Sequence, residues 1–99
     1  MIDAWRLMRG SDLIGTLTVY EVDMPIFLCD FSPGSGWEPV RPLFEAWAQV
    51  QGPDPDGRRT TAALKPIFDL GLHLVPVAGG ERVDRFFLRI DGDKASLRH

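Results

Sequence analysis

The stretch from Leu13 to Phe31 constrains the fold more than any other part of this sequence, because it is dense in β-branched, aromatic and aliphatic residues. Asp23 and Pro25 interrupt the stretch at a point where one strand should end and the next begin. Apolar residues fall at odd and even positions alike, so both faces of each strand carry apolar groups. We therefore expect two neighbouring strands, the first of them central in its sheet or bulged.

Strand-like segments also lie on either side of this stretch. Residues 4–9 form the first, and the turn residues 10–12 should join it to the following strand as an antiparallel hairpin. Residues 72–77 and 82–91 form two later strands. Pro76 predicts an edge position for the first of these two, because proline has no N–H to donate to a neighbouring strand.

The turn at residues 91–93 predicts a final hairpin that ends with residues 94–98. Two registers are compatible with this turn. In one of them Leu88 lies opposite Leu97, and in the other Phe86 lies opposite Leu97. Either register adds a sixth strand to the sheet.

The apolar period changes to that of a helix after the turn-rich residues 32–36. This change predicts a main helix over residues 40–51 that covers one face of the sheet. A short second helix should begin at Thr60 or Thr61 and end at Gly71. The apolar stripe of the main helix consists of Val40, Leu43, Phe44, Trp47 and Val50.

A run of three strands, two helices and three strands is typical of an α+β domain. We predict an antiparallel sheet of five or six strands, with the main helix packed on one face, in a single domain of residues 1–99. A small open barrel is the structural alternative. Residues 52–59 contain two prolines, two glycines and four charged residues, so we expect a mobile loop there.

The composition is that of an ordinary globular protein, with 44% apolar and 25% charged residues. No apolar run approaches the roughly 18 residues that cross a bilayer, and the first residues lack the apolar core of a secretory signal. We therefore expect a cytoplasmic protein with no membrane segment. The net charge of −3 makes nucleic acid an unlikely partner.

Few residues in the chain are suited to catalysis. Cys29 is the only cysteine, and His73 and His99 are the only histidines. Hydrolase chemistry would need a Cys29–His73 dyad or the acidic pair Asp23 and Asp30, and no motif surrounds either set. We predict no catalytic residue, a buried thiol at Cys29 and a structural role for His73.

Metal-binding and cofactor-binding patterns are incomplete. Asp54, Asp56 and Gly57 lack the third acidic ligand and the final glutamate of a calcium loop. The cysteine and histidines do not have the spacing of zinc ligands. The glycines around Gly34 lack the lysine of a phosphate-binding loop. We therefore predict neither a metal nor a cofactor.

The start of the main helix is one candidate for a contact surface. Trp37 lies between a glycine-rich turn and the helix, beside Glu38 and close to Arg41. A tryptophan in this position can close the core as a hydrophobic staple or project as an anchor for a partner. The staple is the simpler interpretation, and this corner is the first choice for a binding surface.

A second candidate surface lies on the strand over residues 82–91. Arg85, Phe87 and Arg89 should share one face of that strand. Arginines interleaved with an aromatic ring are found on single-stranded nucleic-acid platforms and on surfaces that pair with acidic proteins. The acidic charge of the chain favours the second of these uses.

Because every catalytic pattern is incomplete, the leading hypothesis is a non-catalytic interaction or regulatory module. Its partner would be another protein or a second copy of the chain. The alternative is a small-ligand binding domain with an apolar cleft between sheet and helix. A small hydrolase that uses the residues above is the third hypothesis.

Overall fold

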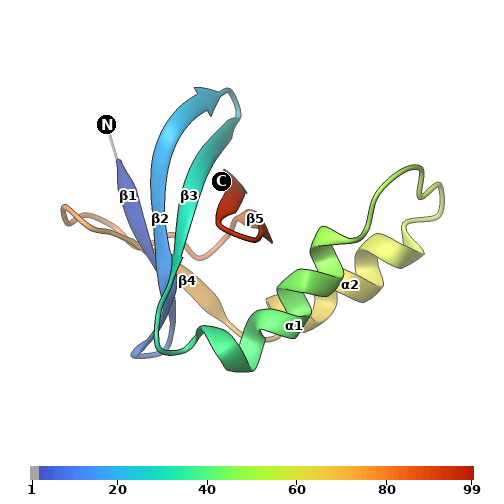
Figure 1. Ribbon diagram of the computed structural model, residues 1–99, viewed down its shortest axis with the longest axis horizontal. Helices are drawn as coiled ribbons and strands as arrows, with labels where there is room; N and C mark the ends of the chain where they lie inside the picture. The colour runs from blue at the N-terminus through green and yellow to red at the C-terminus, as the bar shows by residue number, and fades with distance from the viewer. Residues whose placement is uncertain (1–2) are drawn as a thin grey trace.

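The computed structural model describes residues 3–99, which form one antiparallel sheet and two helices in the predicted order (Figure 1). The prediction of an α+β domain with a six-stranded antiparallel sheet is confirmed. The elements are β1 (Ala4–Arg9), β2 (Asp12–Asp23), β3 (Ile26–Pro33), α1 (Trp37–Ala48), α2 (Arg58–Phe68), β4 (Leu72–Pro76), β5 (Phe87–Asp91) and β6 (Lys94–Arg98).

The strands lie in the order β4-β1-β2-β3-β6-β5, so the long β2 and β3 occupy the middle of the sheet. β2 is both central and bulged, as expected, with a register shift between Val19 and Glu21. In the last hairpin Leu88 lies opposite Leu97. The structure therefore selects the first of the two predicted registers.

β4 lies at one edge of the sheet, in agreement with the prediction from Pro76. Its outer side carries one isolated bridge, in which Leu74 and Val83 exchange two backbone hydrogen bonds of 2.9 Å. The prediction of a continuous strand over residues 82–91 is wrong in its first half, because β5 begins at Phe87. The reason is geometric: residue 83 pairs with β4 while residue 87 pairs with β6, so the segment between them crosses from one edge of the sheet to the other.

The core lies between the inner face of the sheet and α1. Val40 and Phe44 of α1 are 1% and 0% exposed, and this confirms that the main helix packs on one face. Gly15 permits close packing within the sheet, since a Cβ atom there would overlap the ring of Phe31. The buried core residues of the sheet include Trp5, Leu7, Ile14, Leu17, Cys29, Phe31, Leu74, Leu88, Ile90 and Leu97.

Both helices begin earlier than the sequence predicted. α1 begins at Trp37 rather than Val40, and its first turn tolerates Pro39 because the N–H groups there have no helical partner. α2 begins at Arg58, ahead of the predicted Thr60, because its cap comes from the preceding loop. Asp54 accepts a 2.9 Å hydrogen bond from the Thr60 backbone N–H.

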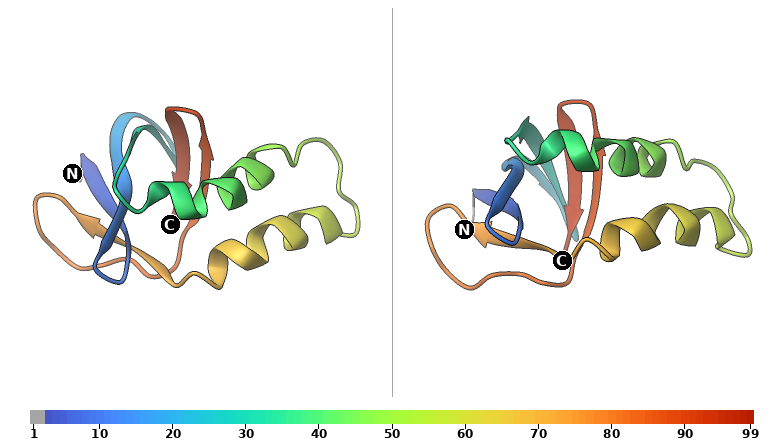
Figure 2. Two further views of the ribbon diagram at one scale, coloured as in Figure 1. Left: turned by 60° about the horizontal axis from the view of Figure 1, so that its bottom comes forward. Right: turned by 90° about the horizontal axis from the view of Figure 1, so that it is seen from below.

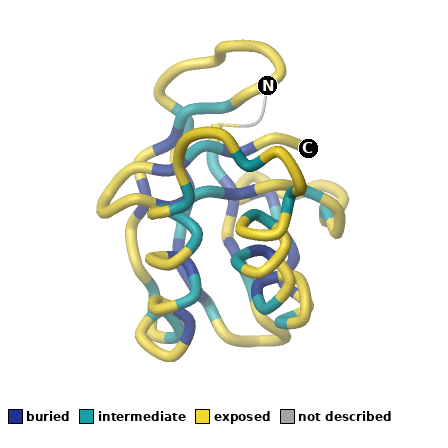
Figure 3. Tube along the Cα trace, turned by 90° about the vertical axis from the view of Figure 1, so that its right-hand side faces the viewer, coloured by how far each residue is buried: buried dark blue, intermediate teal, exposed yellow. Residues whose placement is uncertain are grey.

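α1 and α2 lie side by side and project beyond the sheet, with the loop of residues 49–57 at their far end (Figure 2). Figure 3 shows that the buried residues lie in the strands and the two helices, while the connecting loops are exposed or intermediate. Within residues 3–99, neither helix has the length and apolar character to cross a membrane.

Candidate ligand-binding cleft

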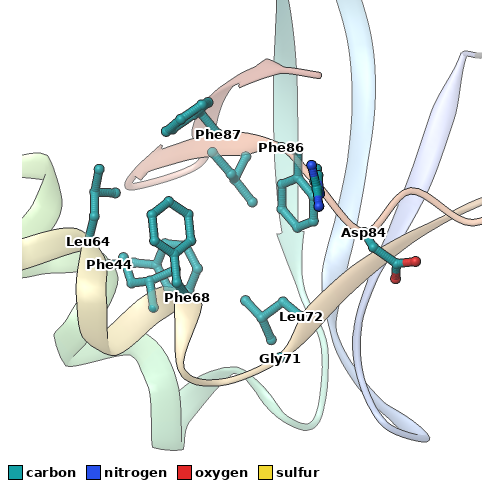
Figure 4. Close-up of a pocket in the computed structure, with 11 residues that line it drawn as sticks. Phe44, Leu64, Phe68, Gly71, Leu72, Asp84, Phe86 and Phe87 are labelled. Carbon is teal, nitrogen blue, oxygen red and sulfur yellow. The ribbon is translucent and has the colours of Figure 1, made fainter.

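A cleft of about 360 Å³ opens between α2, α1 and the start of β5 (Figure 4). Most of its walls are apolar, and the only charged residues among those that line it are Asp84 and Arg85. The apolar side chains around the cleft come from α1, α2, β4, β5 and the connection that precedes β5. They are Phe44, Leu64, Ile67, Phe68, Leu72, Phe86, Phe87 and Leu88.

The local sequence explains how α2 forms one wall of this cleft. Leu64, Ile67 and Phe68 are spaced three and four residues apart, so they lie on one face of the helix. Gly71 then turns the chain with a φ of 68°, a left-handed conformation that favours glycine. This turn brings Leu72, at the start of β4, beneath the same opening.

Two aromatic rings stand at the mouth of the cleft. Phe68 of α2 and Phe87 of β5 meet edge to face, with 5.9 Å between ring centroids. They are nevertheless 53% and 55% exposed. The contact joins α2 to β5 across the opening, and it leaves about half of each ring available to a bound molecule.

Of the two charged residues that line the cleft, Asp84 has an ion-pair partner and Arg85 has none in the described structure. Arg82 holds Asp84 with two contacts to the same carboxylate oxygen, of 2.8 Å from Nε and 2.7 Å from the terminal guanidinium nitrogen. Figure 4 shows the Asp84 carboxylate apart from the aromatic rings. Arg85 forms no ion pair with any residue in the described part of the chain.

A second, shallower hollow of about 190 Å³ adjoins the cleft and shares Phe87 and Leu88 with it. Ser96 and Arg98 of β6 contribute polar groups to this hollow. Trp47 also lines it, and the indole N–H of Trp47 is buried without a hydrogen-bond partner in the described structure. Phe87 is thus the ridge between the cleft and the hollow.

The structure brings only part of the second predicted surface to the cleft. Arg85 and Phe87 line it, as described. Arg89 instead points to the end of α1, where it donates to the backbone oxygens of Trp47 at 2.9 Å, Ala48 at 3.3 Å and Val50. Its guanidinium also stacks on the Trp47 ring at 4.5 Å. Arg89 therefore serves as a cap for α1 and not as a free cation.

The residues of the first predicted surface make contacts within the chain, and Trp37 and Arg41 also line an open hollow of about 580 Å³ between α1 and the β5–β6 turn. Trp37 packs against Phe31 and Phe44, with centroid separations of 4.7 and 5.4 Å, so it contributes to the core. Because α1 begins at Trp37 itself, this residue does not occupy the position before the N-cap that defines a hydrophobic staple. Arg41 forms ion pairs with Glu38 at 3.3 Å and with Glu45 at 3.1 Å along the helix. A binding role for Trp37, Glu38 and Arg41 stays a prediction.

The residues considered for hydrolysis do not assemble. Cys29 is on β3 and His73 is on β4, and β1 and β2 lie between these strands in the sheet. Burial, with a smaller contribution from Asp30, raises the pKa of the Cys29 thiol to about 11. Such a thiol is protonated at neutral pH and is a poor nucleophile. Asp30, which the sequence offered as an acidic pair with Asp23, forms an ion pair with Lys94.

No group of three or more potential metal ligands occurs among residues 3–99. Comparison of the chain with protein-family models, with curated proteins and with solved structures gave no match. The geometry of the cleft is therefore the feature that indicates a function.

Proposed function

We propose that this protein is a non-catalytic domain that binds a small, largely apolar ligand in the cleft between α2 and β5. The observation that carries the proposal is the cleft itself, a cavity of about 360 Å³ with eight apolar side chains and two charged residues around it. Its volume lies within the roughly 300–1,000 Å³ of small-molecule sites, and its lining has their usual balance of apolar walls and few polar groups.

The half-exposed rings of Phe68 and Phe87 support a ligand over simple packing. A bound apolar molecule would remove their exposed surface from water, and this burial contributes about 25 cal/mol per Å². The protein-interaction hypothesis has less support, because Trp37, Arg41 and Arg89 all have partners within the chain.

Thermal unfolding in the presence of octanol tests the proposal. A ligand that binds only the native state stabilises it by about 2.7 kcal/mol when free ligand is 100-fold above the Kd. We expect a melting temperature that rises with octanol concentration. Phe68→Ala should weaken octanol binding about fivefold, because it removes roughly 1 kcal/mol of apolar contact. Tyr20→Ala, at a side chain that is also 53% exposed but lies outside the cleft, should leave binding unchanged.

A blocking variant gives a second, independent readout. Leu64→Trp places two rings in the cleft and should abolish the octanol-dependent rise. Ala62→Trp adds the same group to an exposed position of α2 and serves as the matched control. Folded Leu64→Trp protein that binds octanol as the parent does would contradict a ligand site in the cleft.

A further inference from the structure

We infer that the natural ligand is an amphipathic anion, with its apolar part in the cleft and its negatively charged head beside Phe87, between Arg85 and Arg98. This inference depends on the proposed function and adds the chemical class of the ligand to it. A medium-chain carboxylate is the simplest ligand of this chemical class.

Positive charge remains around Phe87 after the residues that form ion pairs are set aside. Arg82 and Asp84 neutralise each other at the rim. On α2, Lys65 and Asp69 do the same at 3.1 Å. Arg89 is directed to the backbone oxygens at the end of α1. In the described structure this leaves two arginines without an ion pair around Phe87, namely Arg85 and Arg98.

The positions of Arg85 and Arg98 relative to Phe87 also favour a shared ligand. Arg98 lies directly opposite Phe87 in the β5–β6 pair, so the two side chains leave the sheet on the same face. Arg85 precedes Phe87 by two residues and lines the cleft with it. Both arginine side chains are exposed and able to move toward a common head group. Arg85 lines the cleft and Arg98 lines the hollow, and Phe87 lines both.

The hollow also offers hydrogen-bond donors to a ligand. Arg98 carries only donors, and the Ser96 hydroxyl can donate. The accessible donors of the hollow are therefore these two, since the indole N–H of Trp47, although unpartnered, is buried in the described structure. Donors gathered in this way suit an oxygen-rich anion, because hydrogen bonds from cations to carboxylates are about twice as strong as neutral ones. A cationic head would be repelled by the same two arginines.

Three probes that share an eight-carbon chain and differ in the charge of the head group test the inference. They are octanoate, octanol and octyltrimethylammonium. Titration calorimetry at low salt and at monomeric probe concentrations should give octanoate about tenfold tighter binding than octanol. Octyltrimethylammonium should bind more weakly than either. The preference for octanoate should shrink as salt is added, since salt screens exposed charges.

The double variant Arg85→Ala/Arg98→Ala should bind octanol as before and lose the preference for octanoate. Arg6→Ala/Arg9→Ala removes two exposed arginines from β1 and should keep that preference, which controls for net charge. Equal affinity of the parent for octanoate and octanol, or an unchanged preference in the double variant, would overturn the inference while the proposed function stands. Failure of all three probes to bind would overturn the proposed function as well.

Discussion

The two helices carry similar apolar stripes and use them differently. α1 buries Val40 and Phe44 completely against the sheet. α2 packs on α1, and its stripe meets the start of β5 only across an opening, with Phe68 half exposed. The stripe of α1 is therefore used within the core, whereas the stripe of α2 is divided: Leu64 and Ile67 are buried, and Phe68 is left half exposed at the cleft. The exposed part of the α2 stripe is available to a ligand, and ligand binding is the use we propose for it.

The largest expected effect tests whether α1 and α2 differ in their contribution to stability. Phe44→Ala removes a fully buried ring and should lower the free energy of unfolding by about 3–5 kcal/mol. Phe68→Ala should cost less than about 1 kcal/mol, because that side chain is half exposed already. Urea denaturation of both variants measures the difference. Equal losses would mean that α2 is as much a part of the core as α1.

The next effect concerns how the end of α1 is held. Arg89→Ala removes the hydrogen bonds to the last backbone oxygens of α1 and should lower stability by about 1–2 kcal/mol in the same denaturation experiment. Arg89→Lys keeps the charge but not the forked geometry, so it should recover only part of the loss. A lysine variant as stable as the parent would show that charge alone holds this helix end.

The smallest effect concerns the start of α2. Hydrogen bonding from the Thr60 N–H lowers the pKa of Asp54 below its ordinary value of 3.8. A carboxyl whose pKa is lower in the folded state stabilises that state above its unfolded pKa, and this contribution is lost as the pH falls through the folded pKa. Asp54→Ala should therefore lower the melting temperature slightly at neutral pH, and the difference from the parent should vanish in acid. Asp12→Ala, at an exposed carboxyl outside the loop, is the control.

The strands were predictable because their signals are local. Alternation, turn residues and Pro76 are read within a few positions, and they correctly indicated the central bulged strand and the edge position of β4. The segment before Phe87 was wrongly predicted as strand because its alternation continues that of β5. Only the distant bridge between Leu74 and Val83 shows that it leaves the β5–β6 pair.

The cleft was less predictable, because a helical stripe does not reveal which surface it meets. Leu64, Ile67 and Phe68 fall within the predicted second helix, whose apolar residues carry no prediction of a binding role, and a cleft between sheet and helix is only the alternative hypothesis. Arg85 and Phe87 were identified from their alternation on one strand. Arg89 followed the same alternation, yet its contacts are with residues about 40 positions earlier in the chain, the end of α1.

The bridge at Val83 and the placement of α1 have one consequence for the behaviour of the protein in concentrated solution. Unpaired strands at the margins of a sheet invite other chains to add to them. Here Val83 and Pro76 interrupt one margin, and α1 lies against β5 at the other. These features make pairing with another chain less favourable at the β4 margin and place a helix beside β5, although the strands are rich in the residues that fibrils favour.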